Sequence, residues 1–161
     1  MSSGERVVIL DNIRSAQNVG TIFRTADAAG VSQIYLVGIT PAPIDRFGRP
    51  VSALAKAALG AETWVSWRAV ADIQDALREV RAANFSVVAV EQTSAACPLD
   101  KYAPPARAAY IFGNEVAGVD EAVCAQADHV VEIPMRGRKE SLNVAVAAGI
   151  ILFHAPCTSE V

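Results

Sequence analysis

The sequence predicts an α/β domain built on a mostly parallel sheet with helices on both faces. Short runs rich in Val, Ile and Ala, typical of buried strands, alternate with longer segments whose apolar residues recur at helical spacing. Strands that alternate with helices run parallel, because each helix carries the chain back along the sheet. Several of these strands run into polar loops that contain glycine, and open α/β sheets bind ligands at the carboxyl ends of their strands. The fold class therefore also predicts where a site should lie.

The elements can be assigned in order along the chain. Strands are expected over residues 6–11, 33–38, 64–67, 85–90, 108–112 and 129–133. Helices are expected over residues 18–30, 51–59, 70–83 and 120–127, and from Ser141 to near the C-terminus. Asn18 and Gly30 are residue types that begin and end helices, and the loop 39–50 is long enough to be functional.

The last helix is apolar on almost every side, so we expect it to be buried all round. A domain of this size has limited core in which to bury such a helix. A second copy of the chain should therefore cover one face of it, giving a symmetric homodimer.

Length and composition favour a single globular domain. The 161 residues include 52% hydrophobic residues and carry a net charge of −3, so no overall basic balance indicates nucleic-acid binding. Any basic residues that bind nucleic acid must gather on one face. Cys97, Cys124 and Cys157 form no CxxC pair, so we expect reduced thiols in the cytoplasm and no metal site. No signal peptide opens the sequence, and the longest apolar run, 144–153, is too short to span a membrane.

Two strand-end loops near the C-terminus predict a ligand site. The first, GNEVAG (113–118), has the glycine spacing of a phosphate loop but continues with Val119 and Asp120 instead of Lys-Ser/Thr. No GxGxxG follows any strand, so nucleoside triphosphate and dinucleotide sites are disfavoured. The second loop, 134–140, leads into the last helix, whose start directs free backbone N–H groups toward a ligand.

Three segments carry a family resemblance that covers nearly the whole chain. NVGTIFRTADAAGV (18–31), IFGNEVAG (111–118) and IPMRGRKESLNVAVA (133–147) resemble, in order, the signature motifs of the SpoU (TrmH-type) RNA 2′-O-ribose methyltransferases of the SPOUT superfamily. The resemblance implies S-adenosylmethionine as methyl donor, tRNA or rRNA as substrate, a homodimer and a deep C-terminal trefoil knot. We expect one SpoU-type domain over residues 1–161. Unlike longer members of the family, we expect no appended RNA-binding domain, because the predicted elements extend from about residue 6 to near the C-terminus.

The matching positions imply roles for individual residues. Arg24, Asn18, Glu115, Ser141 and Asn143 match the family's catalytic residues. The residues that match its cofactor site are Phe112, Gly113, Ile133, Met135, Ser141, Leu142 and Asn143. We expect loop residues Arg14, Arg46, Arg49, Arg136, Arg138 and Lys139 to form a basic rim for RNA phosphates.

The chemistry demands positioning more than acid–base power. The protein must place a ribose hydroxyl in line with the methyl group and help remove its proton. Arginine is a poor base, since its pKa exceeds about 12. Arg24 is therefore expected either to assist deprotonation or to orient a phosphate and stabilise the developing alkoxide.

Two other functions are compatible with this pattern. A knotted RNA-binding or assembly protein without catalysis would have no need of the complete set of matched catalytic residues. A small-molecule methyltransferase would use the same cofactor site but leave the loop arginines without a role. The sequence does not identify the RNA, the nucleotide, any accessory protein that supplies RNA recognition, or whether Arg24 acts within its own subunit or across the dimer.

Overall fold

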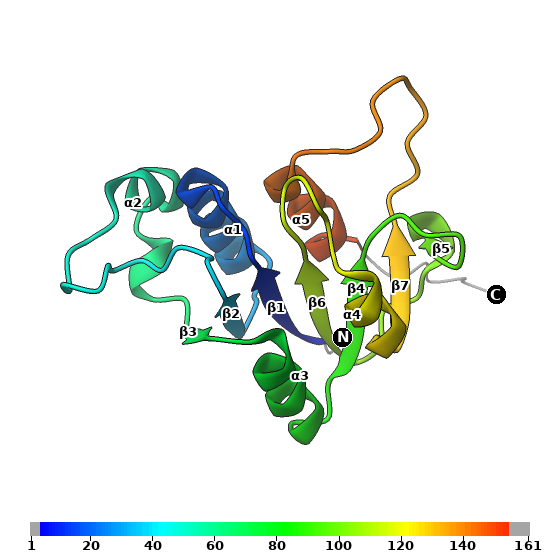
Figure 1. The fold of residues 1–161 in the computed structure, drawn as a ribbon, viewed down its shortest axis with the longest axis horizontal. Coiled ribbons are helices and arrows are strands. Elements are labelled where there is room, and N and C mark those ends of the chain that lie inside the picture. Colours follow the sequence, from blue (N-terminus) through cyan, green and yellow to red (C-terminus); the bar gives the residue numbers. More distant parts are fainter. Residues whose placement is uncertain (1–3, 155–161) are drawn as a thin grey trace.

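The computed structural model describes residues 4–154 and shows one sheet between two layers of helices (Figure 1). The strands are β1 (Glu5–Asp11), β2 (Gln33–Val37), β3 (Trp67–Val70), β4 (Ser86–Val90), β5 (Cys97–Pro98), β6 (Arg107–Phe112) and β7 (His129–Glu132). The helices are α1 (Ala16–Ala28), α2 (Ser52–Ala58), α3 (Ile73–Ala82), α4 (Glu121–Gln126) and α5 (Val144–Leu152). Two short 3₁₀ turns lie at Ala61–Thr63 and Leu99–Lys101.

Every strand pair in the sheet is parallel, in the order β3-β2-β1-β6-β4-β7-β5. After β1 the chain continues to β2, which pairs with one side of β1. Strand β6 comes much later in the sequence and pairs with the other side of β1. The loops that follow β1 and β6 therefore emerge side by side from the carboxyl edge. Such a reversal of strand order is where α/β sheets form a binding crevice.

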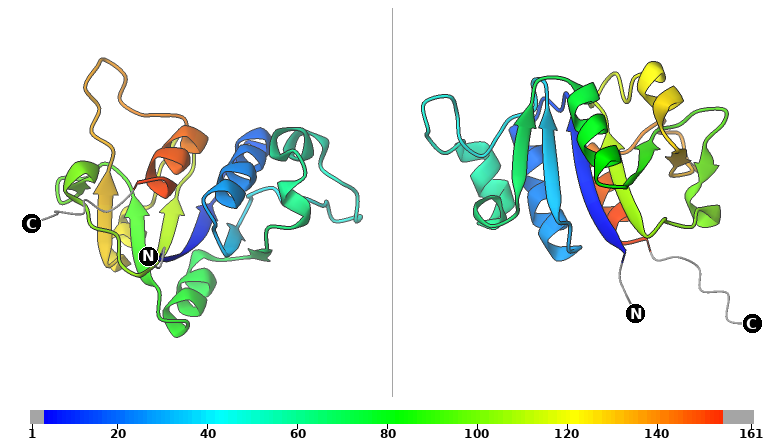
Figure 2. Two further views of the ribbon diagram at one scale, coloured as in Figure 1. Left: turned by 180° about the vertical axis from the view of Figure 1, so that it is seen from behind. Right: turned by 90° about the horizontal axis from the view of Figure 1, so that it is seen from below.

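Side chains alternate between the two faces of the sheet, as strand geometry requires. Val8 and Leu10 belong to a core cluster shared with α1, α2 and α5. Val7 and Ile9 belong to a second cluster shared with α3 and α4. Figure 2 shows the two layers from behind and from below. The prediction of a mostly parallel sheet with helices on both faces is thus confirmed.

Several element boundaries differ from the prediction. Helix α1 begins earlier than expected, because Ser15 is its N-cap and accepts a hydrogen bond from the Asn18 N–H at 3.1 Å. Asn18 is therefore in the first turn instead of at the cap. The strand expected over 64–67 lies at Trp67–Val70, because a 3₁₀ turn occupies the residues before it and Trp67 pairs with Ile34. The short strand β5 lies between the predicted strands 85–90 and 108–112, where the sequence predicts no helix or strand.

The last helix also differs from the prediction. It begins at Val144 instead of Ser141, since Asn143 is its N-cap. It is not buried all round in the single chain: Val146, Ile150 and Phe153 are 51%, 39% and 60% exposed. These three residues are spaced by four and three positions, so they form one apolar stripe on the outer side of the helix.

Candidate functional site

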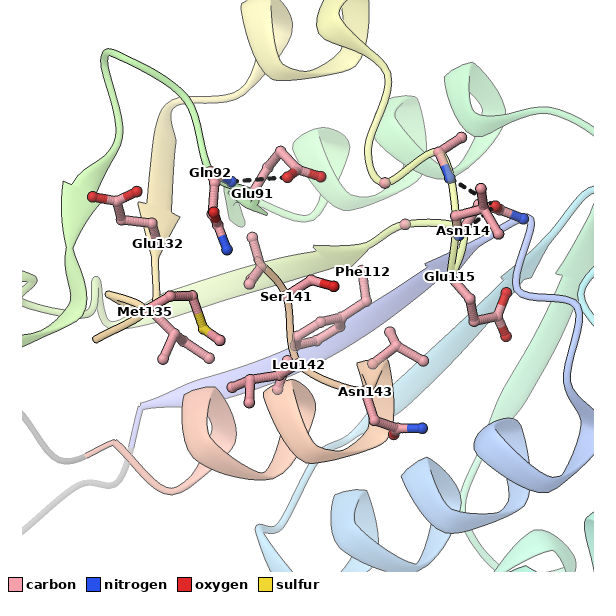
Figure 3. A pocket seen from close by; sticks show the side chains of 18 residues that line it. Glu91, Gln92, Phe112, Asn114, Glu115, Glu132, Met135, Ser141, Leu142 and Asn143 are labelled. Atoms are coloured by element: carbon pink, nitrogen blue, oxygen red, sulfur yellow. Dashed lines mark hydrogen bonds between the residues drawn. The ribbon is translucent and has the colours of Figure 1, made fainter. Parts of the chain in front are cut away.

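A cavity of about 270 Å³ opens at the carboxyl edge of the sheet (Figure 3). Three segments build its walls: the end of β4 with the two residues after it, the loop after β6, and the chain from β7 into α5. All seven residues predicted to contact the cofactor line it, namely Phe112, Gly113, Ile133, Met135, Ser141, Leu142 and Asn143. Segments that lie far apart in the sequence are thus brought together at the place that the fold class predicted.

The charged side chains of the cavity wall are all acidic. Glu91, Glu115 and Glu132 line the cavity, and no Lys or Arg does. A wall with this charge favours a cationic ligand over a phosphate, because like charges repel at short range. Sequence reasoning missed Glu91, Gln92 and Glu132, although each stands at the end of a predicted strand, where a site residue is most expected.

Three sequence motifs meet in one hydrogen-bond network beside the cavity. Asn143 donates its Nδ2–H to Asn18 Oδ1 at 3.1 Å, and Asn18 donates its own Nδ2–H to Glu115 Oε1 at 3.4 Å. The carboxylate of Glu115 also accepts hydrogen bonds from the backbone N–H groups of Arg14 and Ser15 at 3.0 Å. Asn143 Oδ1 accepts from the N–H groups of Ala145 and Val146, which caps α5.

These contacts favour the ionised form of Glu115. Its partial burial disfavours the charged form, but hydrogen bonds from the backbone N–H groups of Arg14 and Ser15 and from the side chain of Asn18 outweigh this. The pKa of Glu115 is therefore lowered from its ordinary value. A carboxylate that stays ionised and already accepts several hydrogen bonds is suited to positioning neighbouring groups, and poorly suited to taking up a proton near neutral pH.

Further contacts stabilise two loops of the cavity wall, the loop after β6 and the loop between β7 and α5. The carboxylate of Glu91 accepts hydrogen bonds from the N–H groups of Gln92 and Val119, the latter at 2.8 Å. Gln92 donates its side-chain N–H to the carbonyl of Glu140 at 2.8 Å, which ties the β7–α5 loop to the end of β4. Gly113 packs so closely on the backbone of Gly118 that a Cβ would lie 2.2 Å from the Gly118 carbonyl carbon. Both the loop after β6 and the β7–α5 loop are therefore fixed to neighbouring parts of the cavity wall.

Ser141 and Arg24, the other predicted catalytic residues, lie in different places. Ser141 lines the cavity. Arg24 lies six residues after Asn18 on the exposed side of α1, and it does not line the cavity of its own chain. The network and the cavity wall of one chain therefore contain four of the five predicted catalytic residues.

The predicted basic rim is divided between two regions. Arg136, Arg138 and Lys139 are exposed on the β7–α5 loop above the cavity, and Arg14 lies on the β1–α1 loop beside Glu115. Arg46 and Arg49 lie instead in the long loop between β2 and α2, at the other end of the sheet (Figure 1). Four of the six basic residues therefore lie on loops that border the cavity, although none of the four lines it.

Two further features concern residues 4–154 alone. In this part of the chain, no three His, Cys, Asp or Glu side chains are grouped as they would be around a metal ion. None of the helices described here has the length and apolar character needed to cross a membrane. Cys157 lies outside the described residues.

Comparison with known proteins decides the family. A model of the SpoU rRNA Methylase family matches residues 5–153. The chain belongs to this family. The tRNA (guanosine(18)-2′-O)-methyltransferase of Thermus thermophilus is 34% identical over 148 residues, which cover 92% of this SpoU chain and 72% of that enzyme.

Solved structures of SpoU-like enzymes show the same fold. The AdoMet-bound rRNA methyltransferase from Sinorhizobium meliloti superposes with a TM-score of 0.82 at 36% identity, covering 94% of this chain and 56% of that one. A protein whose structure was solved to explain 2-OH methylation of C/U34 on tRNA superposes with a TM-score of 0.77 at 26% identity, and 92% of each chain is covered. The same fold therefore occurs both in a longer chain and in one of similar length.

Proposed function

We propose that this chain is an S-adenosylmethionine-dependent methyltransferase that acts on the 2′-hydroxyl of a ribose in tRNA or rRNA in the cytoplasm. One observation carries the proposal: Asn18, Glu115 and Asn143, from three separate motifs, form one network at the rim of the cavity. A protein that kept the fold without catalysis would have no evident need for this arrangement. The names of the relatives support the same activity.

The cavity fits the proposed cofactor by its chemistry. Phe112, Ile133 and Leu142 supply an apolar slot for an adenine ring, and the neighbouring loop backbones supply hydrogen-bonding groups. The three carboxylates favour the positive charge of a sulfonium and an amino group. When bound, S-adenosylmethionine supplies an electrophilic methyl group attached to a positively charged sulfur.

The chain's own residues then have distinct roles. Glu115 and Asn18 position the start of α1 against the cavity rim, and Asn143 holds the start of α5 in register with them. Ser141 offers a hydroxyl from the cavity wall to the cofactor or to the ribose. Arg24 orients an RNA phosphate and stabilises the developing alkoxide by its charge, because its high pKa makes it a poor base.

We propose that the active protein is a homodimer formed through the α1–α5 layer. Support comes from the apolar stripe of Val146, Ile150 and Phe153 on α5, which lies next to α1 in the same layer. In such a dimer, Arg24 serves the cavity of the partner subunit. Arg136, Arg138 and Lys139 then contact RNA phosphates above the cavity, with Arg14 at its edge.

The family resemblance further supports a trefoil knot in the C-terminal part, which we include in the proposal. The hydrogen bond from Gln92 to the Glu140 carbonyl is compatible with it, because it fixes the segment before α5 against the end of β4. Knotted chains are rare exceptions among folds. The high structural similarity to SpoU enzymes is the reason to expect one here.

Two experiments test the function. Calorimetry with S-adenosylhomocysteine should show binding without added metal, and no binding at millimolar ligand would contradict the cofactor assignment. Incubation with labelled cofactor and total RNA from a strain lacking the gene, followed by nucleoside mass spectrometry, should reveal one 2′-O-methylated nucleotide. Labelling of small molecules alone would contradict the RNA substrate.

Mixed subunits test the shared site. Arg24→Ala and Asn143→Ala proteins should each lose methyl transfer by at least about 100-fold, as removal of a positioned group does. Mixing the two should restore activity if Arg24 serves its partner. Sedimentation as a monomer at micromolar concentration would contradict the dimer.

A further inference from the structure

The loop between β2 and α2 projects from the sheet and is internally braced (Figure 1). Its base is closed by the Val51 N–H bond to the Pro43 carbonyl at 3.0 Å, and its tip by the Asp45 N–H bond to the Arg49 carbonyl at 2.8 Å. The side chain of Asp45 accepts hydrogen bonds from the N–H groups of Phe47 and Arg49 at 2.8 and 3.0 Å. The tip is therefore held in one conformation before any partner binds, which lowers the entropy lost on binding.

The tip presents an exposed aromatic ring with two arginines close to it. Phe47 is 67% exposed, so its ring is open to solvent and to a binding partner. The guanidinium carbon of Arg46 lies 4.7 Å from the centre of the ring, and that of Arg49 lies 4.9 Å from it. Arg49 is also held by an ion pair with Asp45 at 3.0 Å. The carboxylate is thus directed into the turn, while both guanidinium groups remain at the exposed ring.

We propose that Phe47, Arg46 and Arg49 form a stacking platform for an unpaired base of the RNA substrate. Unpaired bases stack on aromatic rings and on guanidinium planes, and arginines beside such a ring can contact the adjoining phosphates. The proposal rests on the proposed RNA methyltransferase function and adds a recognition site to it. A base bound there lies away from the cavity of the same chain.

The position of the β2–α2 loop separates the platform from this cavity. Because the sheet is parallel, the loop after β2 leaves from the same edge as the cavity loops, so one RNA molecule can lie along that edge. Strand β1 separates β2 from β6, which puts β2 and β6 on the order of 10 Å apart, and the loop projects farther away beyond α2 (Figure 1). Phe47 therefore lies away from the cavity of its own chain.

The test measures RNA binding with a labelled single-stranded oligoadenylate of about 12 nucleotides, within the usual range for a single-strand site. By fluorescence anisotropy, Phe47→Ala should weaken binding roughly 5- to 150-fold, the range carried by base–aromatic stacking, whereas Phe47→Trp should retain it. Arg46→Gln should weaken binding and lower the slope of log K against log salt by about 0.7, the value for one single-strand phosphate contact. None of these variants should change the affinity for S-adenosylhomocysteine.

A matched control is available in Trp64, which is 62% exposed and has no arginine over its ring in the described part of the chain. Trp64→Ala should bind the oligonucleotide as the wild type does. An equal loss of oligonucleotide affinity in Phe47→Ala and Trp64→Ala would overturn the proposal, and so would unchanged affinity in Phe47→Ala. So would dissociation of a dimer by Phe47→Ala, because the ring would then be covered by a second copy. Oligonucleotide binding that depends on Phe47 in a protein without methyl transfer would refute the proposed function and leave the platform intact.

Discussion

The side chains of Asn18 and Asn143, separated by 125 positions in the sequence, share a hydrogen bond of 3.1 Å. It joins the first turn of α1 to the N-cap of α5, so the two helices that flank the cavity rim are held in register. The same Asn143 side chain caps α5 through its oxygen and reaches Asn18 through its nitrogen. These two contacts can be separated by substitution.

Asn143→Asp should keep the cap and lose the link. A carboxylate accepts the same N–H groups of Ala145 and Val146, but it cannot donate to Asn18 Oδ1. We expect the free energy of unfolding to change by less than about 0.5 kcal/mol and methyl transfer to fall at least tenfold. Asn143→Ala should lose about 1 kcal/mol more stability, because it also removes the cap. Denaturant unfolding and activity, measured together, separate the two effects. Full activity in Asn143→Asp would show that the link is not needed.

Glu115→Gln should change how stability depends on pH. The pKa of Glu115 is lowered in the folded protein, so its contribution is present above the ordinary value of 4.5 and is lost as pH falls through the lowered pKa. The difference in Tm between wild type and Glu115→Gln should therefore be constant near neutral pH and shrink below about pH 4.5. Asp45 and Asp128, whose pKa values are also lowered, are present in both proteins and cancel in this comparison. A difference independent of pH would contradict the assigned role.

Gly113→Ala should destabilise the loop after β6. The new Cβ would meet the backbone of Gly118 and Val119 at 2.2–2.4 Å, and backbone atoms cannot move aside cheaply. Overpacking of this kind typically costs about 1–3 kcal/mol. Gly137→Ala is the matched control, because nothing lies within 4 Å of the corresponding Cβ. Thermal unfolding of the two variants checks the prediction, and equal Tm values would contradict it.

Gln92→Leu should weaken cofactor binding without unfolding the protein. It removes the hydrogen bond from the Gln92 side chain to the Glu140 carbonyl, which holds the β7–α5 loop over the cavity. Loss of one such bond is worth about 1 kcal/mol, or roughly fivefold in affinity for S-adenosylhomocysteine by calorimetry. Gln126→Leu removes a comparable contact with the Ala122 carbonyl on α4, away from the cavity, and should leave the affinity unchanged. The same fivefold loss in both variants would show that the effect is not local.

Local sequence patterns were sufficient to predict the layers, the parallel sheet and the edge of the sheet at which the cavity lies. Strand-like and helix-like periodicity set the element types, and the glycine-bearing loops after the predicted strands 108–112 and 129–133 indicated where a ligand binds. The resemblance of three motifs to the SpoU family predicted which residues form the cavity wall. These features depend on local pattern and on residue identity, which a sequence contains directly.

The contacts that each residue makes at this edge could not be predicted from local patterns. Asn18 has the residue type of an N-cap, but Ser15 takes that position and leaves Asn18 free to bond Asn143 and Glu115. Glu91 and Gln92 follow an ordinary strand, and their roles depend on the approach of loops more than 25 residues away. The exposed stripe on α5 appears only once the core has covered the other side of the helix. Each of these depends on contacts between distant segments, and local propensity carries no information about such contacts.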